Sequence, residues 1–159
     1  MSQSMNEHIT NWQAVGQETI TRVRDLLRLD TRNPPGNEIR AAEYLRALFE
    51  TEGIPGEIVG PSRDRGTFIA RLKGDGSAPP LLLMSHTDVV AVEPEKWTHD
   101  PFSGDIADGY IYGRGALDMK QMVAMEAMTM LLRKFRALGW ASFARSSSWE
   151  KRTTWSSFC

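Results

Sequence analysis

The feature that most constrains this 159-residue chain is an apolar run, Leu81–Ser85, that leads directly into His86. Asp88 follows two positions later. A short apolar run bounded by loop residues is typical of a strand buried on both faces. A buried imidazole or carboxylate costs free energy unless it has a partner, so the end of this predicted strand must supply one.

The pattern on either side of this run alternates helices with strands. Helices are predicted where apolar residues recur at three- and four-residue spacing: residues 12–29, the stretch from a cap at Asn37 to one at Gly53, and residues 119–135. Short strands are predicted at residues 57–59 and 67–72 and after a turn within 108–113. With the buried central strand, this alternation predicts an α/β layered fold with a largely parallel sheet.

His86 and Asp88 stand at the carboxyl end of the predicted strand. Continued extended backbone would point both side chains to the same side, and open α/β sheets bind ligands beyond the carboxyl ends of their strands. A histidine that binds a metal usually has its other ring nitrogen held by a carboxylate. The pair therefore suits a metal ligand with its supporting carboxylate, although an ordinary hydrogen bond in a loop explains it equally well.

The stretch YGRGALDMK, residues 112–120, holds a second candidate, Asp118. Gly113 and Gly115 resemble the start of a dinucleotide-binding loop, but Asp118 stands at the position of its third glycine. A carboxylate there would repel a pyrophosphate, so nucleotide binding is disfavoured. Two interpretations of Asp118 stay open: an N-cap of the following helix, which spacing alone favours, and a carboxylate that bridges two cations.

The composition excludes several classes of function. The net charge of −1 provides no basic surface for nucleic acid, and no apolar run is long enough to span a bilayer. The one cysteine, Cys159, rules out an intrachain disulfide and a cysteine zinc finger. The first residues are polar and lack the features of a signal peptide, so we expect a cytoplasmic protein. The oligomeric state stays open.

Four stretches together resemble one family: DTRNPPGNE, LLLMSHTDVV, EKWTHDPFSG and DGYIYGRGALDMK. They are similar to the N-terminal part of the zinc-dependent amidohydrolases and exopeptidases. That family includes aminoacylase, acetylornithine deacetylase, succinyl-diaminopimelate desuccinylase and carboxypeptidase G. The resemblance covers roughly residues 20–138 and implies a zinc-exopeptidase-like, three-layer fold, with helices on both faces of a largely parallel sheet.

The resemblance also implies roles for individual residues. His86 would bind one zinc ion, Asp88 would orient that histidine and support catalysis, and Asp118 would bridge two zinc ions. The Asp118–Met119 peptide bond is expected to be cis, as in the family. The implied chemistry is metal-dependent hydrolysis of an amide or peptide bond in an N-acyl amino acid or small peptide. Co²⁺ or Mn²⁺ would suit the two ligands as well as Zn²⁺.

Part of the implied site has no counterpart in this chain. Two zinc ions that share one carboxylate need about five ligand residues, and only His86 and Asp118 match. After Asp118 the acidic residues are Glu126 and Glu150, and no histidine or Glu-Glu pair follows. We therefore expect residues 1–138 to be the N-terminal part of an incomplete dizinc catalytic domain, inactive on its own. The alternative is a catalytically inactive remnant that acts as a binding or interaction module.

Residues 139–159 differ in character from the rest of the chain. They contain three of the five tryptophans and a run of three serines, and they show neither helical nor strand periodicity. An exposed amphipathic membrane patch is a weaker interpretation of this composition. We interpret the segment as an atypical, unstructured tail and hypothesise that the reading frame departs from that of the family near Leu138.

The frame hypothesis predicts what the coding DNA contains. Translating the other two frames downstream of the codon for Leu138 should restore a family-like sequence that includes adjacent glutamates. If neither frame does so, the hypothesis fails, and the tail is not the product of a shifted reading frame.

Overall fold

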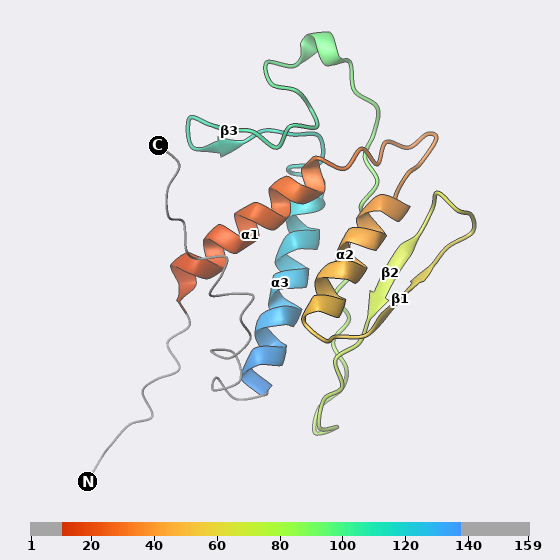
Figure 1. Ribbon diagram of the computed structural model, residues 1–159, viewed down its shortest axis with the longest axis vertical. Helices are drawn as coiled ribbons and strands as arrows, with labels where there is room; N and C mark the ends of the chain where they lie inside the picture. The colour runs from red at the N-terminus through yellow and green to blue at the C-terminus, as the bar shows by residue number, and fades with distance from the viewer. Residues whose placement is uncertain (1–10, 138–159) are drawn as a thin grey trace.

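The computed structural model describes residues 11–137, with side chains as far as Leu132, so the tail at 139–159 lies outside the described residues. Three helices, two hairpins and one short 3₁₀ turn make up this part of the chain (Figure 1). In chain order they are α1 (Trp12–Leu27), α2 (Ile39–Thr51), β1 (Gly56–Val59), β2 (Thr67–Ala70), η1 (Pro94–Lys96), β3 (Ile106–Ala107), β4 (Tyr110–Ile111) and α3 (Lys120–Ala137).

The three predicted helices are confirmed, with small differences at their ends. The Asn11 side chain caps α1 by accepting a hydrogen bond from the Ala14 amide at 3.1 Å. The residue before α2 is Glu38 rather than the predicted Asn37, and its carboxylate pairs with Arg65 at 3.0 Å instead of capping the helix. Gly53 follows the end of α2 with a φ of 64°, a conformation that glycine adopts without strain.

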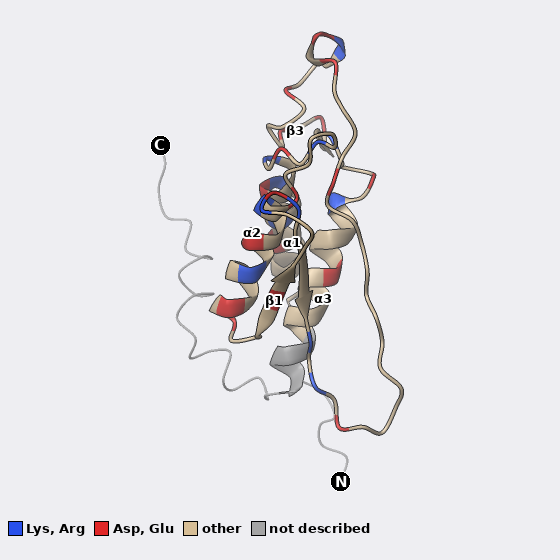
Figure 2. Ribbon diagram, turned by 90° about the vertical axis from the view of Figure 1, so that its right-hand side faces the viewer, with Lys and Arg blue, Asp and Glu red and all other residues tan. Residues whose placement is uncertain are grey.

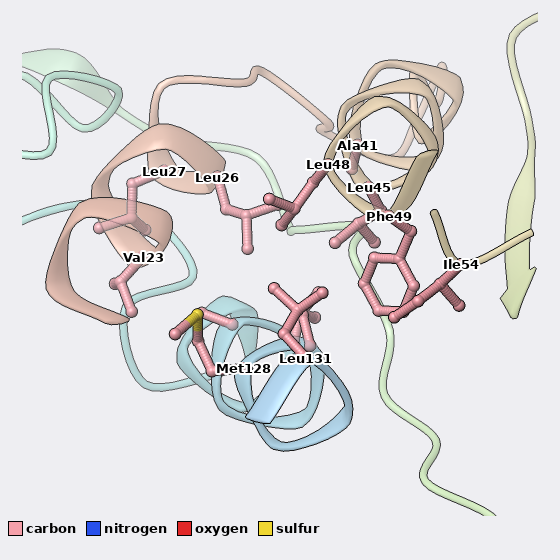
Figure 3. Close-up of a cluster of buried hydrophobic side chains, with 13 residues drawn as sticks. Val23, Leu26, Leu27, Ala41, Leu45, Leu48, Phe49, Ile54, Met128 and Leu131 are labelled. Atoms are coloured by element: carbon pink, nitrogen blue, oxygen red, sulfur yellow. The ribbon is translucent and has the colours of Figure 1, made fainter. Parts of the chain in front are cut away.

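The hydrophobic core lies where the three helices meet. Figure 3 shows side chains of α1 and α2 facing Met128 and Leu131 of α3. Burial of such side chains stabilises the fold by roughly 1.5–3 kcal/mol each relative to exposure. The buried cluster comprises Val23, Leu26, Leu27, Ala41, Leu45, Leu48, Phe49, Ile54, Val123, Ala124, Ala127, Met128 and Leu131.

Both hairpins are antiparallel. Strands β1 and β2 pair from Gly56↔Ala70 to Val59↔Thr67 and pack beside α2 (Figure 1). Phe49 of α2 meets Phe68 of β2 edge to face, with ring centroids 5.1 Å apart. The turn predicted within residues 108–113 is confirmed as the connection between the two-residue strands β3 and β4.

The prediction that Leu81–Ser85 forms a buried strand is wrong for the structure of residues 11–137. This segment belongs to no strand, and Leu81, Leu82 and Met84 are 82%, 78% and 78% exposed. A largely parallel sheet is likewise not seen in this part of the chain, which is a small α/β unit with short antiparallel pairs.

The exposed apolar segment borders a groove. A cavity of about 1020 Å³ is lined by β2 and by residues 82–88, and residues of α2 and α3 also line it. A strand that is apolar on both faces is stable only when neighbouring strands take up its backbone hydrogen bonds. Among the described residues none does so for Leu81–Ser85, and residues 82–85 line the groove instead.

Immediately beyond this segment the backbone does find a partner. The Val89 amide donates to the Thr31 carbonyl at 3.1 Å, and the Asn33 amide donates to the Val89 carbonyl at 2.8 Å. Thr31, which is fully buried, also donates its hydroxyl to the Thr87 carbonyl at 2.6 Å. This short parallel bridge fixes the segment that carries Asp88 against the connection between α1 and α2.

A buried ammonium group joins α1 to the start of α3. Lys120 is fully buried, and its Nζ donates to the carbonyl oxygens of Leu26 at 3.0 Å and Leu29 at 2.7 Å. Burial lowers the pKa of Lys120 to about 8, against the opposing charge of Asp30. Carbonyls at the C-terminal end of a helix are natural acceptors for such a cation.

Charged side chains of both signs are interspersed over the outer surface, as along α2 in Figure 2. The exposed residues Arg40, Glu43, Arg46 and Glu50 alternate in sign on that helix. No helix among residues 11–137 has the length and apolar content needed to cross a membrane.

Replacing Lys120 with methionine should lower the free energy of unfolding by about 1–3 kcal/mol, because buried carbonyls of Leu26 and Leu29 would lose a donor. Urea denaturation followed by circular dichroism measures this. Lys73→Met, at an exposed loop position, is the matched control and should change stability by no more than about 0.5 kcal/mol. Equal stability of the two variants would show that Lys120 does not hold α1 and α3 together.

Candidate metal centre

His86, Asp88 and Asp118 lie together, although 32 residues separate the outer two. The Nε2 atom of His86 is 3.0 Å from Oδ1 of Asp118. Its Nδ1 atom is 3.1 Å from Oδ1 of Asp88 and 3.1 Å from the backbone oxygen of the same residue. The imidazole therefore stands between two carboxylates, with one ring nitrogen directed at each.

A glycine brings the loop that carries Asp118 to this place. Gly115 has a φ of 92°, and a Cβ atom there would lie 2.8 Å from Cγ1 of Val89. Only glycine allows so close an approach in this conformation. The amide of Lys120 donates to the Gly115 carbonyl at 2.9 Å, which closes the loop before α3. The Asp118–Met119 peptide bond is cis, as expected from the resemblance.

Asp118 does not act as the helix cap that spacing alone favours. Helix α3 begins at Lys120, and the Asp118 carboxylate contacts the imidazole of His86 instead. Its side chain is 87% exposed, so the carboxylate has free space on the side away from His86. This is the position that a cation-binding carboxylate requires.

The two carboxylates change the protonation of His86. Partial burial alone would lower the pKa of the imidazole, but the hydrogen bonds and negative charges of Asp118 and Asp88 together raise it above its ordinary value. The surroundings of the ring therefore favour a positive charge there. The same negative field favours a divalent cation, which binds the nitrogen in place of the proton.

The donor atoms fit a zinc ion. Bonds of about 2.0–2.2 Å at a tetrahedral angle place two donor atoms roughly 3.4 Å apart. His86 Nε2 and Asp118 Oδ1 are 3.0 Å apart, in direct contact, so a small separation of the two side chains would admit the ion. Asp88 occupies the second ring nitrogen, as the carboxylate behind a metal-bound histidine does. His86 and Asp118 would hold the ion, and Asp88 would hold His86.

The part of the chain that the structure describes supplies only these two donors. No group of three or more His, Cys, Asp or Glu side chains within it is arranged to hold a metal ion. The carboxylate of Glu126, on α3, accepts a hydrogen bond from Ser85 at 2.7 Å. His99 lies 3.6 Å from Asp105 and stacks on Tyr112 with ring centroids 4.0 Å apart.

The glycines that resemble a nucleotide-binding loop serve chain packing. A Cβ atom at Gly113 would lie 3.0 Å from a methyl group of Leu27, and Gly115 packs against Val89. Close packing against Leu27 and Val89 therefore accounts for both glycines.

Sequence reasoning missed the residues that support Asp88. The Asn33 side chain donates to Oδ2 of Asp88 at 3.3 Å, across 55 positions in the chain. Thr31 anchors the same segment through Thr87. The TRNPPG stretch that contains them contributes to the family resemblance, but a single sequence carries no mark of so distant a contact.

Part of the chain is similar in sequence to known proteins. Residues 82–141 match the family described as peptidase family M20/M25/M40. The chain is 42% identical over 113 residues to succinyl-diaminopimelate desuccinylase of Hydrogenovibrio crunogenus, covering 67% of this chain and 28% of that protein. It is 40% identical over 111 residues to aminoacylase-1 of Sus scrofa, covering 64% of this chain and 26% of that protein.

A shorter and closer match is to succinyl-diaminopimelate desuccinylase of Methylorubrum extorquens, 59% identical over 81 residues, half of this chain and 18% of that protein. The chain thus spans about a quarter of the length of most of these curated relatives. The matched region includes His86, Asp88 and Asp118 together with the loop and helix that position them. Through this region the chain belongs to peptidase family M20/M25/M40, of which it corresponds to an N-terminal part.

Proposed function

We propose that this chain is the N-terminal, metal-binding part of a metal-dependent hydrolase of amide or peptide bonds. One observation carries the proposal: the imidazole of His86 lies 3.0 Å from the Asp118 carboxylate while Asp88 occupies its other nitrogen. The relatives named as a desuccinylase and an aminoacylase support the class of reaction. Since the chain spans only part of them, the activity of the whole protein is a proposal as well.

Each of the three residues has a distinct proposed role. His86 would hold a metal ion through the lone pair of Nε2, and Asp118 would hold the pair of ions through its carboxylate. Asp88 would accept a hydrogen bond from the Nδ1–H group, which fixes the ring and makes Nε2 a stronger donor. When bound, a pair of divalent ions polarises the amide carbonyl and activates a water molecule.

The proposed ions are zinc, two in a complete site, with Co²⁺ or Mn²⁺ as other possibilities. Imidazole nitrogen and carboxylate oxygen are ligands that all three ions accept. The proposed substrate is an N-acyl amino acid or a small peptide, in a cytoplasmic protein. The names of the relatives support an acylated amino acid most directly.

The proposed fold of the complete domain is a three-layer α/β structure with a largely parallel sheet. The exposed apolar segment Leu81–Ser85 and the groove between it and β2 support this, because a further strand seated there would bury Leu82 and Met84. Residues 1–138 would then be the N-terminal part of the dizinc domain, and residues 139–159 a separate tail.

A second candidate is a catalytically inactive remnant that serves as a binding module. It is favoured by the observation that residues 11–137 provide two metal donors and no cluster of three. The two candidates differ in what they require. A hydrolase needs further ligands and a general base from elsewhere, whereas a binding module needs neither.

Alone, the chain should bind Zn²⁺ weakly through His86 and should not hydrolyse N-acetyl amino acids. Two ligands leave each ion held mainly by water, and the missing general base typically contributes about 10²–10⁴-fold to the rate. Calorimetric titration of soluble monomer with Zn²⁺, and a hydrolysis assay with and without zinc, measure both. His86→Ala should abolish the binding, and His99→Ala, at a histidine outside the site, should not.

Two outcomes would contradict this expectation. Zinc binding that survives in His86→Ala would show that the proposed metal centre is wrong. Submicromolar affinity that depends on His86, together with turnover above the rate without enzyme, would show that the chain completes its own site.

A further inference from the structure

The Asp88 carboxylate has a second neighbour on the side away from His86. The Nδ2 atom of Asn33 donates to Oδ2 at 3.3 Å, while Oδ1 lies 3.1 Å from Nδ1 of His86. The two oxygens of one carboxylate therefore meet two different groups. Fixing Oδ2 restricts rotation of the carboxylate and so sets the direction in which Oδ1 faces the imidazole.

Asn33 can fix Asp88 because its own backbone is fixed. Its amide donates to the Val89 carbonyl at 2.8 Å, and the Val89 amide returns a hydrogen bond to Thr31 at 3.1 Å. The fully buried hydroxyl of Thr31 adds a third hydrogen bond, to the Thr87 carbonyl. These bonds lie on both sides of Asp88, so the side-chain amide of Asn33 and the carboxylate of Asp88 are held at a fixed distance.

The guanidinium of Arg32, the residue before Asn33, binds a different carboxylate. Arg32 forms a bidentate pair with Asp30, with nitrogen to oxygen distances of 2.6–3.1 Å, and its guanidinium lies 5.3 Å from the centre of the Phe102 ring. The carboxylate of Asp88 thus receives a neutral amide rather than a guanidinium. A neutral donor orients the carboxylate and leaves its negative charge available to the imidazole.

We propose that Asn33 is a positioning residue that acts through Asp88 to hold His86 in its metal-binding orientation. This inference rests on the proposed function and extends it to a residue of the connection between α1 and α2. It assigns a role to one residue of the TRNPPG stretch, which from the sequence alone contributes only to the family resemblance.

The test is an NMR titration of the full chain with Zn²⁺, following the ring protons of His86. Removing a carboxylate behind a metal-bound histidine typically weakens metal affinity by roughly 10–100-fold. For Asn33→Leu, which keeps the size and removes the donor, we expect the Kd to rise roughly tenfold, at the lower end of that range. Asn37→Leu, in the same connection and with no contact to Asp88, is the matched control and should leave the Kd within about twofold of the wild type.

A second comparison separates positioning from general destabilisation. If Asn33 acts only through Asp88, Asn33→Leu should add nothing to the loss already caused by Asp88→Ala. The melting temperature of every variant is measured alongside. If Asn33→Leu fails to fold, Asn33→Ser replaces it, because the serine hydroxyl is too short to reach Oδ2 and should give the same loss.

The outcomes distinguish this inference from the function on which it rests. An unchanged Kd in a folded Asn33 variant, with binding still lost in His86→Ala, would overturn the positioning role and leave the metal centre standing. Losses that add fully in the double variant would also overturn it. Binding that does not depend on His86 would overturn both proposals.

Discussion

A buried ammonium group holds together two parts of the molecule on which the proposed metal centre depends. Lys120 donates to the carbonyls of Leu26 and Leu29, and this links the beginning of α3 to the end of α1. Asp118 lies two residues before Lys120, so its position depends on this link. The cost of burying a charge in this place is offset by hydrogen bonds to two backbone carbonyls at the end of α1 and just beyond it.

The positions of His86 and Asp88 depend on the residues that directly follow α1. Residues directly after α1 pair with the backbone around Asp88, through Thr31, Asn33 and Val89. The end of α1 and the connection that follows it thus position the two carboxylates that flank His86, those of Asp118 and Asp88. In the described part of the chain, this task falls to helix packing and one short bridge rather than to an extended sheet.

Much of the local structure could be predicted because its cause is local. The spacing of apolar residues predicts the three helices, and turn-forming residues predict the turn between β3 and β4, whereas the antiparallel pairing of β1 with β2 is not predicted. Leu81–Ser85 shows where such reasoning ends: its apolar residues indicate a strand with neighbours on both sides, and residues 11–137 supply none. Spacing also favoured a helix cap at Asp118, and only the resemblance pointed to its contact with His86. The contact between Asn33 and Asp88 spans 55 positions, so no local pattern could have revealed it.

The central claim is that His86 and Asp118 share one metal ion. Anomalous diffraction at the zinc absorption edge, from crystals of the chain soaked with Zn²⁺, tests it most directly. We expect one peak about 2 Å from Nε2 of His86 and about 2 Å from a carboxylate oxygen of Asp118. Peaks found only at other residues such as His99, with His86 and Asp118 in direct contact and no ion between them, would contradict the claim.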